Sequence, residues 1–279
     1  LTNGTVDAIA MPSELVEEAE DAGCTVVGFE DTTWGLCFNT QNEVMCNLNI
    51  RKAFTQAFTR EKVLTHLPKG TTVADYIIPP ETKLFGRDYR QQVGNETFYP
   101  QQDSTVAQLL LAGLQELGLE ALPSVTILCS DDPEVKLMAN EMLTEWNVLF
   151  DNYFNMEPLS DKELASRIAA GSYQIAICSI TPESSGPLAV LDLFRSDNPN
   201  NPAGLHSTGY DENLSKAENQ SGAEAAATCA AMERYLNEQC IFYPLFYENH
   251  YFASAPGVTG IVYHPYGGGV DFIHAGKES

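Results

Sequence analysis

Residues 122–179 constrain the fold most, because they alternate short apolar stretches with amphipathic ones. The run SVTILCS (124–130) is β-branched and ends at two aspartates and a proline, which is typical of a buried strand that leads into a helix. Asp132 is expected to cap that helix and Pro133 to begin it. The apolar residues that then recur at helical spacing are Val135, Met138, Ala139, Met142 and Trp146.

A second unit follows in the same order. We expect a strand over 148–156, a helix that begins with a capping box between Ser160 and Glu163, and a third strand over 173–178. The order strand, helix, strand, helix, strand gives parallel pairs with right-handed crossovers, and ligands usually bind beyond the carboxyl ends of such strands. The loop after Cys178 is therefore the first place to expect a binding site.

The remaining elements are predicted from periodicity and from turn residues. Helices are expected over 13–22, 47–64, 104–117, 210–218 and 221–236, and strands over 6–11, 24–29, 34–39, 241–247, 251–253, 257–263 and 270–274. Residues 70–94 are expected to form a long irregular connection, and the glycines of HPYGGG a turn. The charged residues of the helix after Asn47, Arg51 among them, are expected on a solvated face.

Composition and charge exclude several classes of protein. The chain has 279 residues, of which 44% are hydrophobic and 19% charged, so general disorder is excluded. A formal charge of −23 argues against a nucleic-acid partner. The acidity either keeps the protein soluble or creates a field that favours cationic ligands. The sequence shows no apolar run that could span a bilayer, and residues 1–10 lack the pattern of a secretory signal.

The cysteines and histidines do not form a recognisable metal or redox motif. The seven cysteines lack CxxC spacing; Cys129 and Cys178 lie in apolar strands and are expected to be core residues. In a secreted protein, bridges such as Cys37 to Cys46 or Cys229 to Cys240 are alternatives between which the sequence does not choose. The five histidines are far apart and form no HExxH, so neither a metal nor a cofactor is expected.

Six stretches in the correct order resemble the oligopeptide and dipeptide solute-binding family, the extracytoplasmic binding proteins of ABC importers. The second of them has Thr59 where the family usually has Asp. The six stretches are GTVDAIAMP, FNTQNEVMCNLNIRKAFTQAFTREKVL, residues 77–81, residues 135–176, residues 209–217 and PLFYENHYFASAPGVTGI.

The resemblance implies an α/β fold, a type II periplasmic-binding-protein-like lobe with a mixed sheet and flanking helices, beside an incomplete first lobe. Family chains are about twice this length, so the chain is expected to be the C-terminal half. Residues 1–33 would then be strands and a helix of the truncated first lobe, 34–250 the second lobe, and 251–279 strands returning to the first. A signal peptide and a lipid-bearing cysteine would lie upstream, which implies a cell-surface lipoprotein or periplasmic protein.

The function that the resemblance implies is binding. Two lobes close on an extended peptide, and a membrane permease recognises the closed form. In this family an acidic residue four positions before a proline pairs with the α-amino group of the peptide, and Pro187 places that acid at Glu183. A carboxylate suits such a charge-assisted bond, while the alternative is a solvated loop acid.

The neighbours of Glu183 are expected to line the same site. Ile180, Thr181, Ser184 and Ser185 surround it, whereas the family often has aromatic residues there. This difference leaves a metal chelate, a sugar or a signalling peptide as alternative cargo. Trp34, at the junction of the lobes, either lines the cleft or fills the core.

An enzyme is the alternative from a different class, and the sequence gives it no support. The chain contains neither a GxSxG nor an SxxK motif near a strand end, and no histidine is recognisable as the base for a loop serine. We therefore expect a binding protein that catalyses no reaction.

Overall fold

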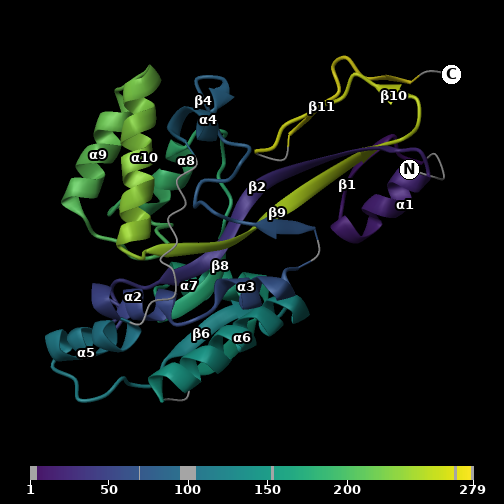
Figure 1. The fold of residues 1–279 in the computed structure, drawn as a ribbon. Helices are drawn as coiled ribbons and strands as arrows, with labels where there is room; N and C mark the ends of the chain where they lie inside the picture. Colours follow the sequence, from purple (N-terminus) through teal and green to yellow (C-terminus); the bar gives the residue numbers. More distant parts are fainter. Residues whose placement is uncertain (1–4, 69, 95–104, 152–153, 267–268, 278–279) are drawn as a thin grey trace.

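A mixed β-sheet runs through the molecule with helices on both faces (Figure 1). The computed structural model describes residues 5–68, 70–94, 105–151, 154–266 and 269–277. Within these residues the main sheet has the order β1-β9-β2-β8-β6-β7, and β3 pairs with β9. Its strands are β1 (Ala8–Met11), β2 (Thr25–Phe38), β3 (Thr71–Val73), β6 (Thr126–Ser130), β7 (Asn155–Leu159), β8 (Ile175–Ile180) and β9 (Phe242–Ser254).

The other elements are helices and three short strand pairs. The helices are α1 (Val16–Asp21), α2 (Leu48–Gln56), α3 (Arg60–Val63), α4 (Tyr89–Val93), α5 (Val106–Leu117), α6 (Pro133–Phe150), α7 (Asp161–Ala169), α8 (Leu188–Leu191), α9 (Thr208–Glu218) and α10 (Gly222–Glu238), with 3-10 turns at Ser13–Leu15, Leu64–His66 and Asp192–Phe194. The pairs are β4 (Lys83–Leu84) with β5 (Arg87–Asp88), β10 (Val258–Thr259) with β13 (Gly276–Lys277), and β11 (Val262–Tyr263) with β12 (Val270–Asp271).

The central unit has the predicted order and direction of strands. β6 lies between β7 and β8 and pairs parallel with both. The Asp132 carboxylate accepts hydrogen bonds from the backbone N–H of Glu134 (2.8 Å) and Val135 (3.0 Å), so the predicted cap of α6 is confirmed. The predicted capping box is wrong: Ser160 precedes α7, but its side chain makes no cap hydrogen bond, and the bond between the two residues runs from the Glu163 N–H to the Ser160 carbonyl.

The strand predicted over 148–156 is also wrong. α6 continues through Phe150, whose ring lies in the core, while Val148 on the same helix is 78% exposed. Asp151 then adopts a left-handed conformation with φ of 48°, which ends the helix, and β7 begins only at Asn155. A short apolar run is compatible with either a strand or the last turn of a helix. Here the run continues the helix, which brings Phe150 into the core.

β2 and β9 are each one long strand where the sequence predicted two. They pair antiparallel from Thr25 opposite Ser254 to Cys37 opposite Phe242, with register shifts at Glu30/Thr32 and Trp34/Gly35. Their outer ends project from the helix-covered part and carry β1, α1 and the C-terminal strand pairs (Figure 1). We call this projection the arm (residues 5–30 and 249–277) and the rest the body (residues 31–248).

Two hydrophobic layers cover the sheet of the body. Leu36 and Phe38 face the layer that includes α2, α5 and α6, while Cys37 between them faces the layer that includes α8, α9 and α10. In the first layer the Trp146 ring meets Phe54 edge to face at 4.8 Å and donates its indole N–H to the Phe54 carbonyl (3.0 Å). Such aromatic pairs add about 0.5–1.5 kcal/mol to the burial of their surface.

Arg51 is buried, although the sequence predicted a solvated face. Its guanidinium donates to the carbonyls of Met45 (2.7 Å), Cys46 (2.8 Å) and Gln239 (3.0 Å). Burial lowers the pKa of Arg51. Arginine can be buried in this way because its planar fork of donors satisfies several carbonyls at once.

The remaining sequence predictions have mixed outcomes. Residues 70–94 are more regular than expected, since they contain β3, β4, β5 and α4. All seven cysteines are free, so the bridges Cys37–Cys46 and Cys229–Cys240 do not form; Cys129 and Cys178 are buried as predicted. Most of the predicted glycine turn lies outside the described residues. In the part of the chain that the structure describes, no helix is both long and apolar enough to cross a membrane.

Candidate functional site

Two cavities, an outer and a central one, lie where the arm meets the body, and a third, inner cavity beside them is lined by the body alone. The outer cavity (about 820 Å³) is lined by the loop after β8, including Glu183, and by β9. The central cavity (about 340 Å³) shares His250 with the outer one, and the inner cavity (about 510 Å³), beside α7, shares Trp34 and Glu248 with the central one. The shared residues connect the three cavities into one row at the carboxyl ends of β6 and β8.

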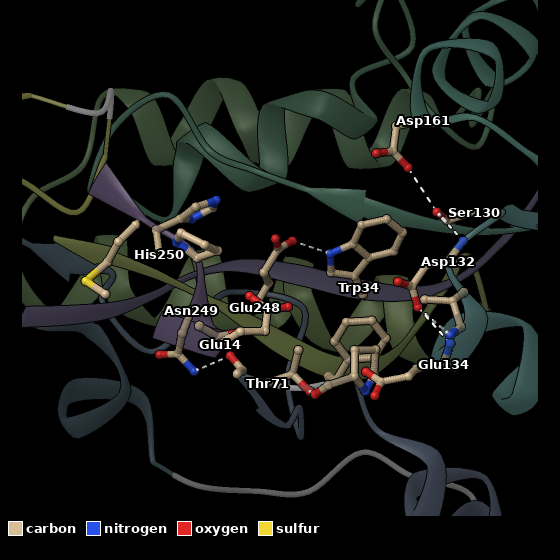
Figure 2. A pocket seen from close by; sticks show the side chains of 17 residues that line it. Glu14, Trp34, Thr71, Ser130, Asp132, Glu134, Asp161, Glu248, Asn249 and His250 are labelled. Atoms are coloured by element: carbon tan, nitrogen blue, oxygen red, sulfur yellow. Dashed lines mark hydrogen bonds between the residues drawn. The ribbon is translucent and has the colours of Figure 1, made fainter. Parts of the chain in front are cut away.

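Trp34 and Glu248 line both the central and the inner cavity. The Trp34 indole N–H donates to Glu248 Oε2 at 2.7 Å, as Figure 2 shows. The Trp34 ring stacks on Phe246 with 5.7 Å between centroids and 12° between planes, and Phe246 belongs to the core. Trp34 thus packs against the core and also lines two of the cavities.

Asp31 and His250 form an ion pair between β2 and β9. Nδ1 of His250 lies 2.5 Å from Oδ1 of the buried Asp31, which also accepts a hydrogen bond from the Thr32 hydroxyl (3.1 Å). The hydrogen bond with Asp31 raises the pKa of His250, and partial burial of the ring opposes this effect. The pair stands at the register shift of β2 and lines the outer cavity.

Glu183 and Thr181 line the outer cavity together with Asp31 and His250. The Glu183 side chain is exposed at the end of the β8 loop. The Thr181 hydroxyl forms a hydrogen bond with the Thr32 hydroxyl at 3.0 Å, which ties this loop to β2.

The other predicted site residues lie elsewhere. The Ile180 side chain is 2% exposed and packs in the core below α8 and α10, so it can offer a ligand only its backbone. Ser184 and Ser185 are exposed, but neither lines the three cavities, and the Ser185 carbonyl accepts the N–H of Lys83 (2.7 Å). Trp34 lines the central and inner cavities rather than the outer one.

Sequence reasoning missed Asp31, Glu248 and His250. All three interrupt strands that are otherwise apolar or β-branched, in the runs FEDTTW and LFYENHYF. Charged residues in the middle of a strand that the sequence marks as buried are a signal of a polar site. The sequence prediction missed this site because it treated these charged residues as breaks between separate strands.

The central cavity is strongly acidic. Carboxylates from four parts of the chain surround Trp34 in Figure 2, namely Glu14, Asp132, Glu134, Asp161 and Glu248. Asp161 accepts a hydrogen bond from the Ser130 hydroxyl at 3.0 Å. Such a site favours cationic groups. Within the described ranges, no three His, Cys, Asp or Glu side chains are grouped as metal ligands.

Comparison with known proteins confirms the resemblance inferred from the sequence. The dipeptide-binding protein DppE of Bacillus subtilis is 26% identical to this chain over 284 residues, which is 95% of the chain and 49% of DppE. The oligopeptide ABC transporter substrate-binding domain of Bacillus anthracis superposes with a TM-score of 0.76, at 18% identity, over 99% of this chain and 55% of that one. OppA of Listeria monocytogenes bound to peptide superposes with a TM-score of 0.74, at 18% identity, over 99% of this chain and 55% of that one.

The comparisons establish the fold and a partial match. No protein-family model matches the chain. The chain spans about half the length of the relatives that it matches. Its mixed sheet with flanking helices is the periplasmic-binding-protein-like fold of these substrate-binding proteins.

Proposed function

We propose that this chain is the C-terminal part of the substrate-binding protein of an ABC importer, which captures peptides between two lobes and delivers them to a membrane permease. The relatives named above support this, since they carry the names of dipeptide- and oligopeptide-binding proteins. In this proposal residues 34–250 form the second lobe, while 1–33 and 251–279 belong to the first. The protein acts outside the cytoplasm, held by a lipid anchor or free in a periplasm, and catalyses no reaction.

The surface of the arm supports this division into lobes. Several large apolar side chains of the arm are exposed, and among them Phe272 is 55% and Ile273 is 81% exposed. Other exposed apolar residues of the arm are Val6, Ile9, Leu15 and Val262. Exposed apolar surface of this kind supports the proposal that another segment or partner covers the arm. The rest of the first lobe is the segment we assign to it.

The observation that carries the proposal is the position of Glu183 in the outer cavity. Its exposed carboxylate stands at the end of a strand, where α/β proteins bind ligands, and the cavity around it lies between the arm and the body. A peptide N-terminus brings an ammonium group that Glu183 accepts in a charge-assisted hydrogen bond. Main-chain hydrogen bonds to the extended peptide supply affinity that does not depend on its sequence.

Calorimetry with the intact protein tests this assignment. Tetra-alanine and N-acetyl-tetra-alanine are titrated into the wild-type protein, into Glu183→Gln and into the control Glu212→Gln, which changes an exposed acid on α9. Hydrogen bonds to charged groups contribute about 1.5–3 kcal/mol, so we expect acetylation or Glu183→Gln to weaken binding roughly tenfold to a hundredfold. The two losses should not add, because both remove the same bond.

Two results would contradict the proposal. Equal affinity for free and acetylated peptide would remove Glu183 from the role of amine acceptor. Binding of a sugar or a metal chelate, with no binding of any peptide, would replace the cargo altogether.

A further inference from the structure

The inner cavity differs in chemistry from the acidic cavity next to it. Its wall is the side of α7 that carries Leu164, Ala165 and Ile168, and Cys178 of β8 adds to the apolar lining. A hydrogen bond with Cys37, together with burial, raises the pKa of Cys178, so this thiol stays neutral. Apolar atoms therefore dominate the interior of the cavity.

Three of the polar residues at the border of the inner cavity make hydrogen bonds within the protein, while Ser179 and Asn200 complete this border. The Trp34 N–H bonds to Glu248, and Asp161 accepts the Ser130 hydroxyl. Because the indole N–H of Trp34 is bonded to Glu248, Trp34 presents the apolar part of its ring to the cavity. A volume of about 510 Å³ falls within the range of about 300–1,000 Å³ that is typical of ligand pockets.

The inner cavity also belongs to the row of cavities in which the proposed function places the peptide. It adjoins the central cavity at Trp34 and Glu248, and the central cavity adjoins the outer one at His250. In the proposed function the N-terminus of the peptide lies at Glu183 in the outer cavity, and the row of cavities leads from there toward the inner one. This order gives a residue beyond the first a route to the wall formed by α7.

We propose that the inner cavity is a specificity subsite that takes an aliphatic or aromatic side chain of the bound peptide, downstream of its first residue. This inference rests on the proposed function and adds the class of peptide that the protein prefers. Filling such a cavity removes apolar surface from water, and full burial of a Leu or Phe side chain corresponds to a gain in affinity of roughly tenfold to a hundredfold.

Calorimetry of the intact protein with a peptide scan tests the subsite. The probes are tetra-alanine, the peptides in which Leu replaces each alanine in turn, and the matching Lys peptides. For the wild-type protein we expect one Leu peptide, substituted after position 1, to bind at least tenfold tighter than tetra-alanine, and the Lys peptide of that position to gain less.

Two variants of α7 connect this preference to the cavity. Ala165→Trp fills the inner cavity and should abolish the advantage of the Leu peptide over tetra-alanine, both measured in the same variant. Ser166→Trp is the matched control, because Ser166 is the next residue of α7, is exposed and lies outside the lining, so the advantage should persist. Ala169→Leu narrows the same cavity and provides a second measure if Ala165→Trp does not fold.

The outcomes separate this inference from the proposed function. If wild-type protein binds peptides but shows no Leu preference, or if Ala165→Trp and Ala169→Leu leave the preference intact, the subsite is refuted and the proposed function stands. A loss of tetra-alanine binding equal to that of the Leu peptide in folded Ala165→Trp also refutes it. If the wild-type protein binds no peptide at all, the proposed function falls and the subsite with it.

Discussion

At the scale of single residues, the Asp31–His250 pair makes the junction sensitive to pH. The pKa of His250 is raised in the folded chain by its hydrogen bond with Asp31. In the unfolded chain the pKa of His250 is about 6.5. At a pH below this value the pair with Asp31 contributes its full stabilisation to the fold, and the stabilisation is lost as the pH rises through the higher pKa that His250 has in the folded chain. The imidazole is half exposed, so solvent screens the pair and the effect on stability is small.

An NMR titration of the His250 ring protons checks this shift. We expect the titration midpoint of His250 to lie above that of an ordinary histidine, and Asp31→Asn to lower it, because the variant removes the charge that favours the imidazolium. Glu43→Gln, an exposed substitution on a loop of the body, should leave the midpoint unchanged. An unchanged midpoint in Asp31→Asn would show that the ion pair does not form in solution.

At the scale of elements, a buried ion pair fastens the connection 70–94 to α10. Arg90 on α4 donates to both carboxylate oxygens of Glu233 (3.0 and 2.9 Å), and Glu233, which is buried, also accepts the N–H of Ile78 (3.2 Å). The Arg90 guanidinium lies over the Tyr76 ring, 3.7 Å from its centre. The connection thus obtains its position from these polar contacts together with the buried apolar side chains of Ile77, Ile78, Leu84 and Tyr89.

Removing one partner of the Arg90–Glu233 pair should destabilise the fold more than replacing both partners. Glu233→Ala leaves the largely buried Arg90 charge uncompensated, so we expect the free energy of unfolding to fall by about 3–5 kcal/mol. The double variant Arg90→Met/Glu233→Met should recover part of that loss, because neither charge remains. Urea unfolding measures both, and a double variant less stable than Glu233→Ala would contradict the argument.

Elements whose apolar residues repeat at one regular spacing were predictable from the sequence. Elements in which apolar and polar stretches alternate along the length were not. The apolar face and cap of α6 follow from helical spacing and from Asp132–Pro133, and the parallel unit around β6 follows from the alternation of strands and helices. β2 and β9 were split in the prediction because polar residues occupy their middles. Arg51 was placed at the surface because helical spacing does not show which carbonyls a later segment brings close.

The candidate site shows the same division. The loop of Glu183 was predictable, since the carboxyl end of a strand in such a unit is a known position for ligands. The contribution of β9 was not, because Glu248 and His250 are more than 200 residues from Trp34 and Asp31, and only the register of β2 with β9 brings them together. Long-range strand pairing leaves no local pattern from which it can be predicted.

At the scale of the whole molecule, binding should depend on both lobes. The body supplies Glu183, Trp34 and Glu248, but in our proposal the arm is only a part of the first lobe. A peptide loses conformational freedom when it binds, and its contacts with the protein must outweigh this loss. A site formed by one lobe makes fewer of these contacts than a site formed by two.

We therefore expect the 279-residue chain alone to bind tetra-alanine at least a hundredfold more weakly than the intact protein. The exposed apolar residues of the arm should also make the isolated chain self-associate, which sedimentation velocity detects. Replacing Ile273 by Ser in the isolated chain should reduce this association. Micromolar peptide binding by the monomeric chain alone would contradict the two-lobe requirement.

The two breaks in register of β2 and β9 have a geometric consequence. An irregular position bends a ladder and increases its twist, and the two breaks flank the three residues from Thr32 to Trp34. The direction in which the arm leaves the body is therefore set at these residues. Since Trp34 also lines the central and inner cavities, the residues that aim the arm also shape the space beside it.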